Sequence, residues 1–321
     1  MELARAESGK LRVPEPWRFV ALGIAIVLTA AMIATGKWHV EDYVVLPFYA
    51  ALPWFGPGAR RLSFSITPFL VAGILYDLYG LLMPYRGAVH VSDLYLTDLT
   101  LFGAPFAGTK MILPDWLALH AHPAIDAVTG AAYILYLAEV FILAIYLHFR
   151  DPPRTLVLGL GFFVMNVAGM ILWFCWPAAP PWYVSLHGLG PADMSALPSP
   201  AGTARFDTLI GYPLFHGFYA RSVNVFGAMP SLHCAYPTLT FLVVRSRSRS
   251  LFAFTLGFAL LVVFSAMYLQ HHYVLDVLAG LTTGTVCYFT ARALAKVVTA
   301  RLAEPRAGAP SAAFTVDGSQ A

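Results

Sequence analysis

Charged residues are scarce in this sequence of 321 residues: Asp, Glu, Lys and Arg make up 12% of it, about half their share in an average soluble domain. Hydrophobic residues account for 59%, and the mean hydropathy is +0.68. This composition excludes an ordinary soluble globular protein. Apolar stretches of about 17 to 25 residues, the length that crosses a bilayer as a helix, recur along the chain and predict an integral membrane protein.

Cysteine is rarer still, with three residues that stand far apart in apolar surroundings: Cys175, Cys234 and Cys287. The sequence contains no Cys-x-x-Cys pair and no Cys/His spacing typical of a metal site, so it gives no support for a disulfide framework or a structural metal. Short alternating segments typical of a membrane β-barrel are missing as well. The expected fold class is therefore all-α, a polytopic bundle of transmembrane helices.

Eight apolar stretches are candidate membrane spans. They cover residues 18–36, 43–58, 63–84, 128–149, 155–176, 230–246, 251–270 and 272–295. The second is short and contains Pro47, Pro53 and Pro57, so we expect a tilted or re-entrant piece there. The first follows a charged stretch and has no small-residue cleavage site, and we expect it to be retained as a helix.

The placement of basic residues predicts the orientation of these spans. With eight spans and a cytoplasmic N-terminus, fifteen of the twenty Lys and Arg residues fall on the cytoplasmic side. The five on the outer side are Lys37, Arg86, Lys110, Arg205 and Arg221. The positive-inside rule then places both termini in the cytoplasm, and we expect the membrane to be a bacterial plasma membrane. The Arg-Ser run at 245–250 becomes a cytoplasmic hairpin, and no nucleic-acid partner is expected.

This topology divides the chain into three parts. Residues 1–62 form an N-terminal tail with the first membrane segments, residues 63–297 form the main transmembrane domain, and residues 298–321 form a polar cytoplasmic tail that we expect to be disordered. Two long outer loops, residues 85–127 and 177–229, interrupt the main domain. We expect them to fold over the bundle as short helices that hold aromatic side chains in the headgroup zone. These side chains are Trp116, Trp182 and Tyr183.

A Gly-Ala-Met-Pro-Ser-Leu-His segment at residues 227–233 leads from the second outer loop into the sixth span. Because a helix begins there, unpaired backbone N–H groups together with Ser231 would form a site for an anion. His233, when protonated, would add a positive charge and a movable proton. Taken alone, the pattern also fits a structural or solvated histidine.

A second cluster, His271-His272-Tyr-Val-Leu-Asp276, stands at the outer start of the eighth span. The four-residue spacing places His272 and Asp276 on one face of a helix. A carboxylate in a membrane segment needs a partner, and pairing with one imidazole nitrogen would leave the other as a nucleophile or base. The alternative is a structural ion pair. Because the basic residues place both clusters on the outer side without reference to the histidines, a shared site is favoured.

At these residues the sequence resembles a known family. Pro230 to His233 looks like the second motif of the type 2 phosphatidic acid phosphatase superfamily, and Ser265 through His272 to Asp276 looks like the third. The doubled histidine is most similar to the inositol phosphorylceramide synthase branch. The runs 76–103 and 175–183 are similar to that branch as well, and the resemblance covers most of residues 63–295.

The resemblance implies a six-helix core and a phosphohistidine mechanism without a metal or other cofactor. His272 would attack phosphorus, Asp276 would orient the imidazole, and His233 would protonate the departing oxygen. The substrates would be two lipids, a phospholipid donor and an acceptor with a hydroxyl group such as ceramide or diacylglycerol. The group moved would be a phospho-alcohol headgroup, with phosphoinositol as the leading candidate.

Two departures from the phosphatase pattern favour the transferase branch. Ala266 stands where phosphatase members have an Arg after the third-motif Ser, and the Lys-to-Arg-Pro first motif is missing. The phosphate's cationic partner is therefore open; Ser231 and Arg221 are our candidates for phosphate binding, and Asp77 and His271 for headgroup binding.

Two other functions are alternatives to headgroup transfer. In a lipid-phosphate phosphatase of the same superfamily, water would take the place of the acceptor at the same intermediate. A transporter with a His/Asp proton relay would distribute ionisable groups along several spans, whereas here they gather at one end of the bundle.

Overall fold

The computed structural model describes residues 11–222 and 224–303, and the chain is helical almost throughout. Six helices are long and apolar enough to cross a membrane. They are α2 (Trp17–Thr35), α4 (Pro57–Tyr79), α7 (Pro123–Arg150), α8 (Pro152–Cys175), α13 (Arg249–Tyr268) and α14 (Val274–Ala303). The sixth predicted span is a shorter apolar helix, α12 (Leu232–Val244). In the described ranges the sheet content is a single hairpin of β1 (Ala104–Phe106) and β2 (Thr109–Met111), so the predicted all-α membrane bundle is confirmed.

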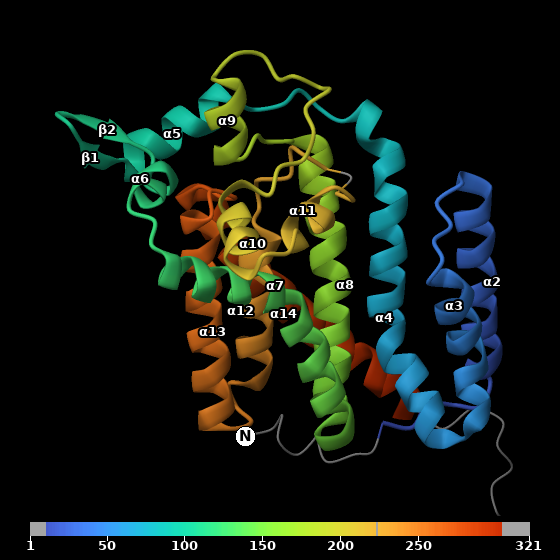
Figure 1. Ribbon diagram of the computed structural model, residues 1–321. Helices are drawn as coiled ribbons and strands as arrows, with labels where there is room; N and C mark the ends of the chain where they lie inside the picture. The colour runs from blue at the N-terminus through green and yellow to red at the C-terminus, as the bar shows by residue number, and fades with distance from the viewer. Residues whose placement is uncertain (1–10, 223, 304–321) are drawn as a thin grey trace, which may run out of the picture.

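The second predicted span, residues 43–58, is not a spanning helix. The chain forms a ten-residue helix α3 (Asp42–Ala51), a 3₁₀ helix η1 (Leu52–Phe55) and then a break at Gly56, which has a φ of 117°. Ten helical residues extend only about 15 Å, half the thickness of the hydrocarbon core. Figure 1 shows α3 lying beside α2 and returning the chain to the end of the bundle where α4 begins.

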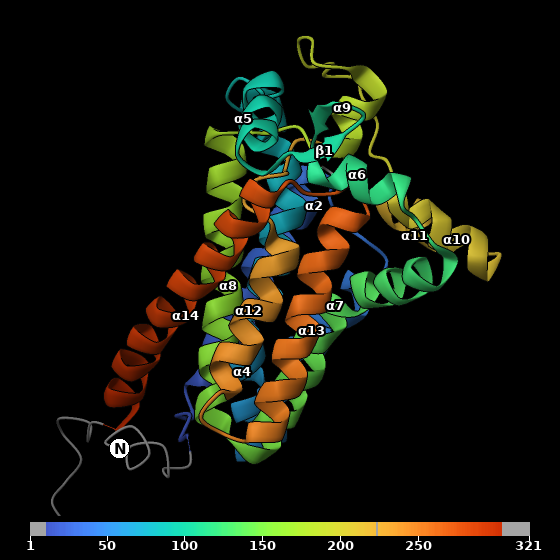
Figure 2. The same ribbon diagram turned by 90° about the vertical axis from the view of Figure 1, so that its left-hand side faces the viewer.

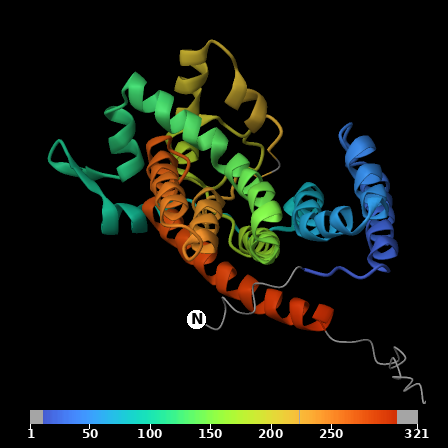
Figure 3. The same cartoon turned by 90° about the horizontal axis from the view of Figure 1, so that it is seen from below.

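Helix α12 lies at the centre of a six-helix core. It contacts α7, α8, α13 and α14, and α4 packs on the far side of α8. Large apolar side chains fill the interior of this core, among them Phe162, Met165, Trp173 and Leu239. Helix α2 packs on both α3 and α4, and α2 and α3 stand beside the core, as the view in Figure 3 shows.

The loops that were predicted to be cytoplasmic meet at one end of the bundle, the lower end in Figure 1. Arg154 in the α7–α8 hairpin donates a hydrogen bond to Ser246 in the α12–α13 hairpin, at 2.9 Å, and the Arg247 guanidinium lies 3.8 Å from the Asp151 carboxylate. Arg61, near the start of α4, lies at the same end. The basic residues thus gather as predicted, while their placement in the cytoplasm stays a prediction.

The two long loops cover the opposite end of the bundle, and their helical character is confirmed. They contain α5 (Ser92–Phe102), α6 (Leu113–Leu119), α9 (Pro181–His187), α10 (Ala204–Ile210) and α11 (Leu214–Tyr219), with a 3₁₀ helix, η3 (Ala201–Thr203). A second 3₁₀ helix, η2 (Gly80–Tyr85), leads from α4 into the first loop. Figure 2 shows α5, α6 and α9 above the ends of α12 and α13, with α10 and α11 beside the end of α13.

The prediction that Trp182 and Tyr183 lie in the headgroup zone is wrong. Their side chains are 6% and 1% exposed and pack with Phe226 in a small core of the outer loops. The two loops are joined by backbone hydrogen bonds, including one from the Ala179 N–H to the His90 carbonyl at 2.9 Å. These aromatic side chains therefore stabilise the cap over the bundle.

Helix α14 is longer than predicted. It continues to residue 303, so residues 298–303 extend the last helix and are not the start of a disordered tail. Residues 304–321, the rest of the predicted tail, and residues 1–10 lie outside the described residues.

Candidate active site

His233 is the second residue of α12, and the start of this helix lies inside the bundle. At 13 residues α12 is about 20 Å long, shorter than its neighbours, and Figure 2 shows it beginning below the outer end of α8. Ser231 is the N-cap of the helix, and its hydroxyl oxygen accepts a hydrogen bond from the Cys234 N–H. The short helix therefore places His233 below the outer loops.

The structure brings the two predicted histidine clusters together. Nδ1 of His233 lies 3.0 Å from Nε2 of His272. His272 belongs to the turn at residues 269–273 between α13 and α14, in which the N–H groups of His271 and His272 both donate to the Ala266 carbonyl at 3.1 Å. This turn directs the His272 side chain toward the start of α12.

Asp276 lies behind His272, but the two side chains are not directly hydrogen-bonded. The Asp276 Oδ2 atom is 3.6 Å from Nδ1 of His272 and accepts a hydrogen bond from the Tyr273 N–H at 2.9 Å. Nδ1 instead donates to the Ala228 carbonyl at 2.9 Å. The Asp276 carboxylate is fully buried, and its Oδ1 has no hydrogen-bond partner among the described residues. It acts on the imidazole through its charge at short range.

These contacts assign the tautomers of both imidazoles. Nδ1 of His272 faces a carbonyl and a carboxylate, both acceptors, so it carries the proton and Nε2 has a lone pair. His233 must then donate from Nδ1, which leaves its Nε2 as an acceptor whenever the ring is neutral. The lone pair of His272 thus accepts the hydrogen bond from His233, and the second nitrogen of His233 is left for a substrate.

Close packing of α12 and α14 fixes the positions of the two histidines relative to each other. Gly280 and Gly284 stand one helical turn apart on α14, the small-residue spacing that lets membrane helices approach closely. A Cβ atom on Gly280 would lie 2.3 Å from the Ser231 carbonyl oxygen, and one on Gly284 would lie 2.7 Å from that of Ala235. The backbones are therefore in direct contact at the start of α12.

His271 belongs to a stack of aromatic rings beside the pair. Its imidazole stacks on Tyr219 at 4.8 Å and on Tyr133 at 5.1 Å, and Tyr133 also stacks on His233 at 4.4 Å. Burial, together with the neighbouring His272, lowers the pKa of His271 to about 3. His271 is therefore neutral near pH 7 and does not supply a positive charge to a phosphate.

The backbone at the start of α12 offers hydrogen-bond donors for an anion. The Ser231 hydroxyl is fully buried and caps the helix, while its N–H donates to the Asp276 carbonyl at 3.1 Å, so this residue fastens α12 to α14. The N–H groups of Leu232 and His233 have no acceptor within the described part of the chain. Such unpaired donors at a helix start bind phosphate well.

No described contact joins any of the three outer arginines to the histidine pair. Arg205 pairs with Asp126 at 2.7 Å and lies over the Tyr268 ring, and Arg86 lies over the Phe226 ring at 4.7 Å. Arg221 is exposed in the loop that follows α11. The structure therefore leaves the prediction for Arg221 untested.

Asp77, the other predicted headgroup residue, faces away from the pair. Its charged neighbours are Lys37, His39, Glu41 and Asp42, all next to α3. The adjacent Tyr76 instead lies near Ser222 and Tyr219, on the side of the aromatic stack.

The described residues contain no group of three or more His, Cys, Asp or Glu side chains arranged to hold a metal ion. The acidic side chains closest to the start of α14, Asp98 and Asp276, accept hydrogen bonds from backbone N–H groups. The site is therefore built from imidazole nitrogens and backbone groups.

Asp98 is a site residue that the sequence did not reveal. It belongs to α5 in the first outer loop, yet its carboxylate accepts a hydrogen bond from the Leu275 N–H at 2.9 Å and so caps the start of α14. Burial raises its pKa to about 6, an effect that the Leu275 amide opposes and the Asp276 carboxylate strengthens. Because 177 positions separate the two partners, no local pattern could have predicted the contact.

Known proteins resemble this chain in sequence. The PAP2 superfamily profile matches residues 109–290, a range that contains the histidine pair and Asp276. The chain is 30% identical to the phosphoinositol dihydroceramide synthase of Bacteroides thetaiotaomicron over 82% of this chain and 86% of that protein. It is 33% identical to the inositol phosphorylceramide synthase catalytic subunit of Schizosaccharomyces pombe, over 74% of this chain and 56% of the relative.

A third relative is covered over a smaller share of its length. The chain is 34% identical to inositolphosphotransferase 1 of Saccharomyces cerevisiae, over 73% of this chain and 42% of the relative. It thus spans about half the length of these two fungal proteins and most of the bacterial one. No solved structure gives a significant match.

Proposed function

The chain belongs to the PAP2 superfamily and is a lipid phosphotransferase, and on this premise we propose that it moves phosphoinositol from a phospholipid to the hydroxyl group of a second lipid. The observation that carries the proposal is the contact between His233 and His272, in which one imidazole has a lone pair on Nε2 and the other can carry a proton. The names of the bacterial and fungal relatives support phosphoinositol as the group transferred.

In the first displacement, the lone pair on Nε2 of His272 attacks the phosphorus of the donor. A P–N bond forms while the bond between phosphorus and the departing glycerol oxygen breaks. Protonated His233 gives its proton to that oxygen, and diacylglycerol leaves. An anionic phosphodiester beside His233 favours the protonated imidazole that this step needs.

In the second displacement, the acceptor hydroxyl gives its proton to neutral His233 and attacks phosphorus. The P–N bond breaks, and both histidines return to their starting states. Splitting the transfer into two displacements eases each step. The Ala228 carbonyl and the Asp276 carboxylate hold the Nδ1 proton of His272 and stabilise the positive charge that this ring gains on phosphorylation.

For the phosphoryl oxygens we propose the free N–H groups of Leu232 and His233 as ligands, with Arg221 as the cation. Ser231 contributes by capping the helix that presents these N–H groups. His271 is the proposed headgroup residue beside the pair, whereas Asp77 is reached only by a headgroup that extends toward α3.

We propose that the reaction takes place at the extracytoplasmic face of a bacterial plasma membrane. The covered end of the bundle, which holds the pair, is opposite the end where the basic loops gather. The proposed acceptors are lipids with two chains and a free hydroxyl, such as ceramide or diacylglycerol.

The test uses purified chain in vesicles with inositol-labelled phosphatidylinositol and short-chain ceramide. Label that appears on a second lipid supports transfer, whereas label released only as inositol phosphate would show hydrolysis. The variant His272→Ala should neither transfer nor become labelled, and transfer by this variant would refute the phosphohistidine. A matched control is His148→Ala, which replaces a histidine at the opposite end of the bundle.

A further inference from the structure

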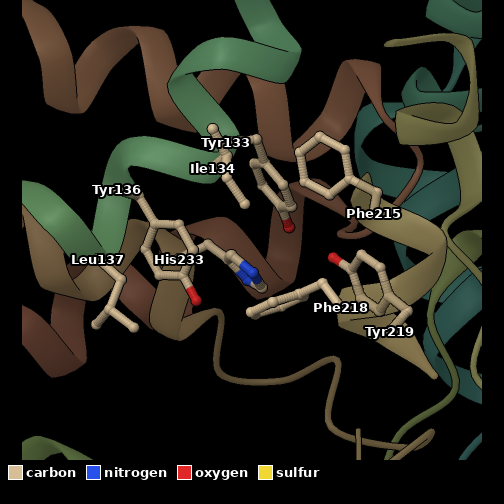
Figure 4. A pocket seen from close by; sticks show the side chains of 8 residues that line it. All are labelled: Tyr133, Ile134, Tyr136, Leu137, Phe215, Phe218, Tyr219 and His233. Atoms are coloured by element: carbon tan, nitrogen blue, oxygen red, sulfur yellow. The ribbon is translucent and has the colours of Figure 1, made fainter. Parts of the chain in front are cut away.

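A small cavity lies beside His233, between α7 and α11. Its volume is about 60 Å³, room for a few water molecules or one hydroxymethyl group. Four side chains with polar groups line it, Tyr133, Tyr136, Tyr219 and His233, and apolar walls that include Phe215, Phe218 and Leu137 enclose the rest. Figure 4 shows the hydroxyl groups of Tyr133 and Tyr219 pointing into the space next to the His233 imidazole.

The Tyr133 hydroxyl is a buried polar group without a hydrogen bond of good geometry. The residue is 1% exposed, and the polar group next to its hydroxyl is that of Tyr219. The Tyr219 hydroxyl also makes a long contact of 3.4 Å to Nδ1 of His271. Buried hydroxyl groups need well-aligned partners, so this pair of phenols indicates a ligand atom that completes their hydrogen bonding.

The stacked rings fix the Tyr133 phenol relative to the reacting imidazole. The Tyr133 ring lies 4.4 Å from the His233 ring at an angle of 12°, and 5.1 Å from the His271 ring at 16°. Tyr219 stacks on His271 at 4.8 Å and 8°. Because Tyr133 packs against both imidazoles and is almost fully buried, its ring and hydroxyl are held at the cavity.

The cavity lies beside the imidazole that would deprotonate an incoming oxygen. An oxygen that attacks phosphorus in line stands opposite Nε2 of His272 and next to the general base. Because Nδ1 of His233 faces His272, Nε2 is the nitrogen of His233 left to serve an oxygen on the far side of the phosphorus. No described residue occupies that nitrogen.

We propose that this cavity binds the hydroxyl group of the acceptor lipid and that Tyr133 positions it for attack on the phosphohistidine. The inference rests on the proposed function. The acceptor oxygen accepts a hydrogen bond from the Tyr133 hydroxyl, donates its own proton to Nε2 of His233, and directs its remaining lone pair to phosphorus. The P–N bond to His272 then breaks as the new P–O bond forms, so protons and electron pairs balance.

The walls and surroundings of the cavity suit a lipid better than water. Phe218 is 48% exposed and Leu135, next to the cavity on α7, is 49% exposed, so this flank presents apolar side chains to the membrane. Tyr212, in the turn before α11, is 63% exposed on the same flank. An acceptor can bring its hydroxyl to His233 while its chains remain in apolar surroundings, and the aromatic walls disfavour the water that would hydrolyse the intermediate.

The test measures which fraction of the phosphoinositol bound to His272 is transferred to lipid and which is released by water. Enzyme labelled from inositol-labelled phosphatidylinositol is given increasing short-chain ceramide, and the concentration at which transfer to lipid equals release of inositol phosphate is recorded. The competition between lipid and water begins only after diacylglycerol has left, so binding of the donor does not affect this concentration. For Tyr133→Phe we expect this concentration to rise about five- to tenfold, the loss of one hydrogen bond.

The matched control is Tyr79→Phe. Tyr79 is 4% exposed, and its hydroxyl has no partner in the described part of the chain, but it does not line the cavity. Normal labelling of Tyr133→Phe by the donor shows that the variant is folded. If Tyr133→Phe leaves the ceramide concentration for equal transfer and hydrolysis unchanged, or if both variants change it equally, the acceptor site is overturned. A wild-type chain that labels but never transfers to lipid overturns the proposed function instead.

Discussion

Nδ1 of His233 lies 3.0 Å from Nε2 of His272, so the proposed general acid and the proposed nucleophile are hydrogen-bonded to each other. Phosphorus bound to Nε2 of His272 must take the place of this hydrogen bond. The same contact therefore keeps the lone pair of the nucleophile on Nε2 and marks the position of the phosphoryl group.

The His233→Ala variant should lose the proton donor for the departing oxygen but keep the nucleophile. We expect phosphoenzyme formation from phosphatidylinositol to slow by about 10²–10⁴, the usual contribution of general acid catalysis. With a p-nitrophenyl phosphodiester, whose leaving group needs no proton, labelling of the variant should recover to near the wild-type rate. Equal loss on both donors, measured by rapid quench, would show that His233 is not the acid.

Gly280→Ala should disturb the contact between α12 and α14. Its Cβ would lie 2.3 Å from the Ser231 carbonyl oxygen, and overpacking of this kind costs about 1–3 kcal/mol. We expect a lower Tm in detergent and reduced transfer. The control Gly257→Ala on α13, where a Cβ would meet no heavy atom within 4 Å, should leave Tm unchanged or slightly higher. A Gly280→Ala variant as stable as wild type would contradict the packing argument.

The buried carboxyl group of Asp98 should make the stability of the fold depend on pH. Burial raises its folded-state pKa from 3.8 to about 6, so the unfolded chain loses this proton first as pH rises. The protonated form stabilises the fold fully below about pH 4, and this contribution, about 3 kcal/mol, is lost as pH rises through 6. Asp98→Asn keeps the acceptor for the Leu275 N–H and removes the titration.

The measurement for Asp98 is the difference in Tm between Asp98→Asn and wild type across pH 4.5 to 7.5. We expect this difference to move in favour of the variant as pH rises, because wild type alone must then hold a buried charge. A difference that is constant with pH would show that Asp98 does not titrate in this range.

Arg221→Ala tests the proposed cation for the phosphate. Loss of a charge-assisted hydrogen bond of about 1.5–3 kcal/mol predicts a KM for phosphatidylinositol that is about ten- to a hundredfold higher, with partial recovery in Arg221→Lys. Arg249→Ala, an exposed arginine at the opposite end of the bundle, serves as the control. If Arg221→Ala leaves the donor KM unchanged while Arg86→Ala raises it, the cation is Arg86, which lies over Phe226.

The orientation in the membrane can be tested by thiol labelling of intact cells. Lys110, in the β1–β2 hairpin, and Ser250, at the start of α13, are both exposed at opposite ends of the molecule. In a chain whose three free cysteines are replaced, a membrane-impermeant maleimide should label Lys110→Cys at once and Ser250→Cys only after permeabilisation. The reverse pattern would place the site on the cytoplasmic face.

The fold class and the histidine pair could be predicted because they depend on local patterns. Hydropathy marks the long helices, since a helix in hydrocarbon must satisfy its own backbone and shield it with apolar side chains. The segment Ser231-Leu232-His233 and the spacing from His272 to Asp276 are likewise readable within one helical turn. The bias of basic residues then placed both histidines at the same end of the bundle.

The sequence by itself thus determined a helical membrane bundle with two histidines and a carboxylate gathered at one end. Only the tertiary structure decided that the Ala228 carbonyl, and not Asp276, accepts the His272 proton, that Asp98 caps α14, and that Tyr133 faces His233. Each of these contacts joins segments that are tens of residues or more apart. Their partners depend on how the outer loops and helices pack, and short-range patterns in a sequence carry no record of that packing.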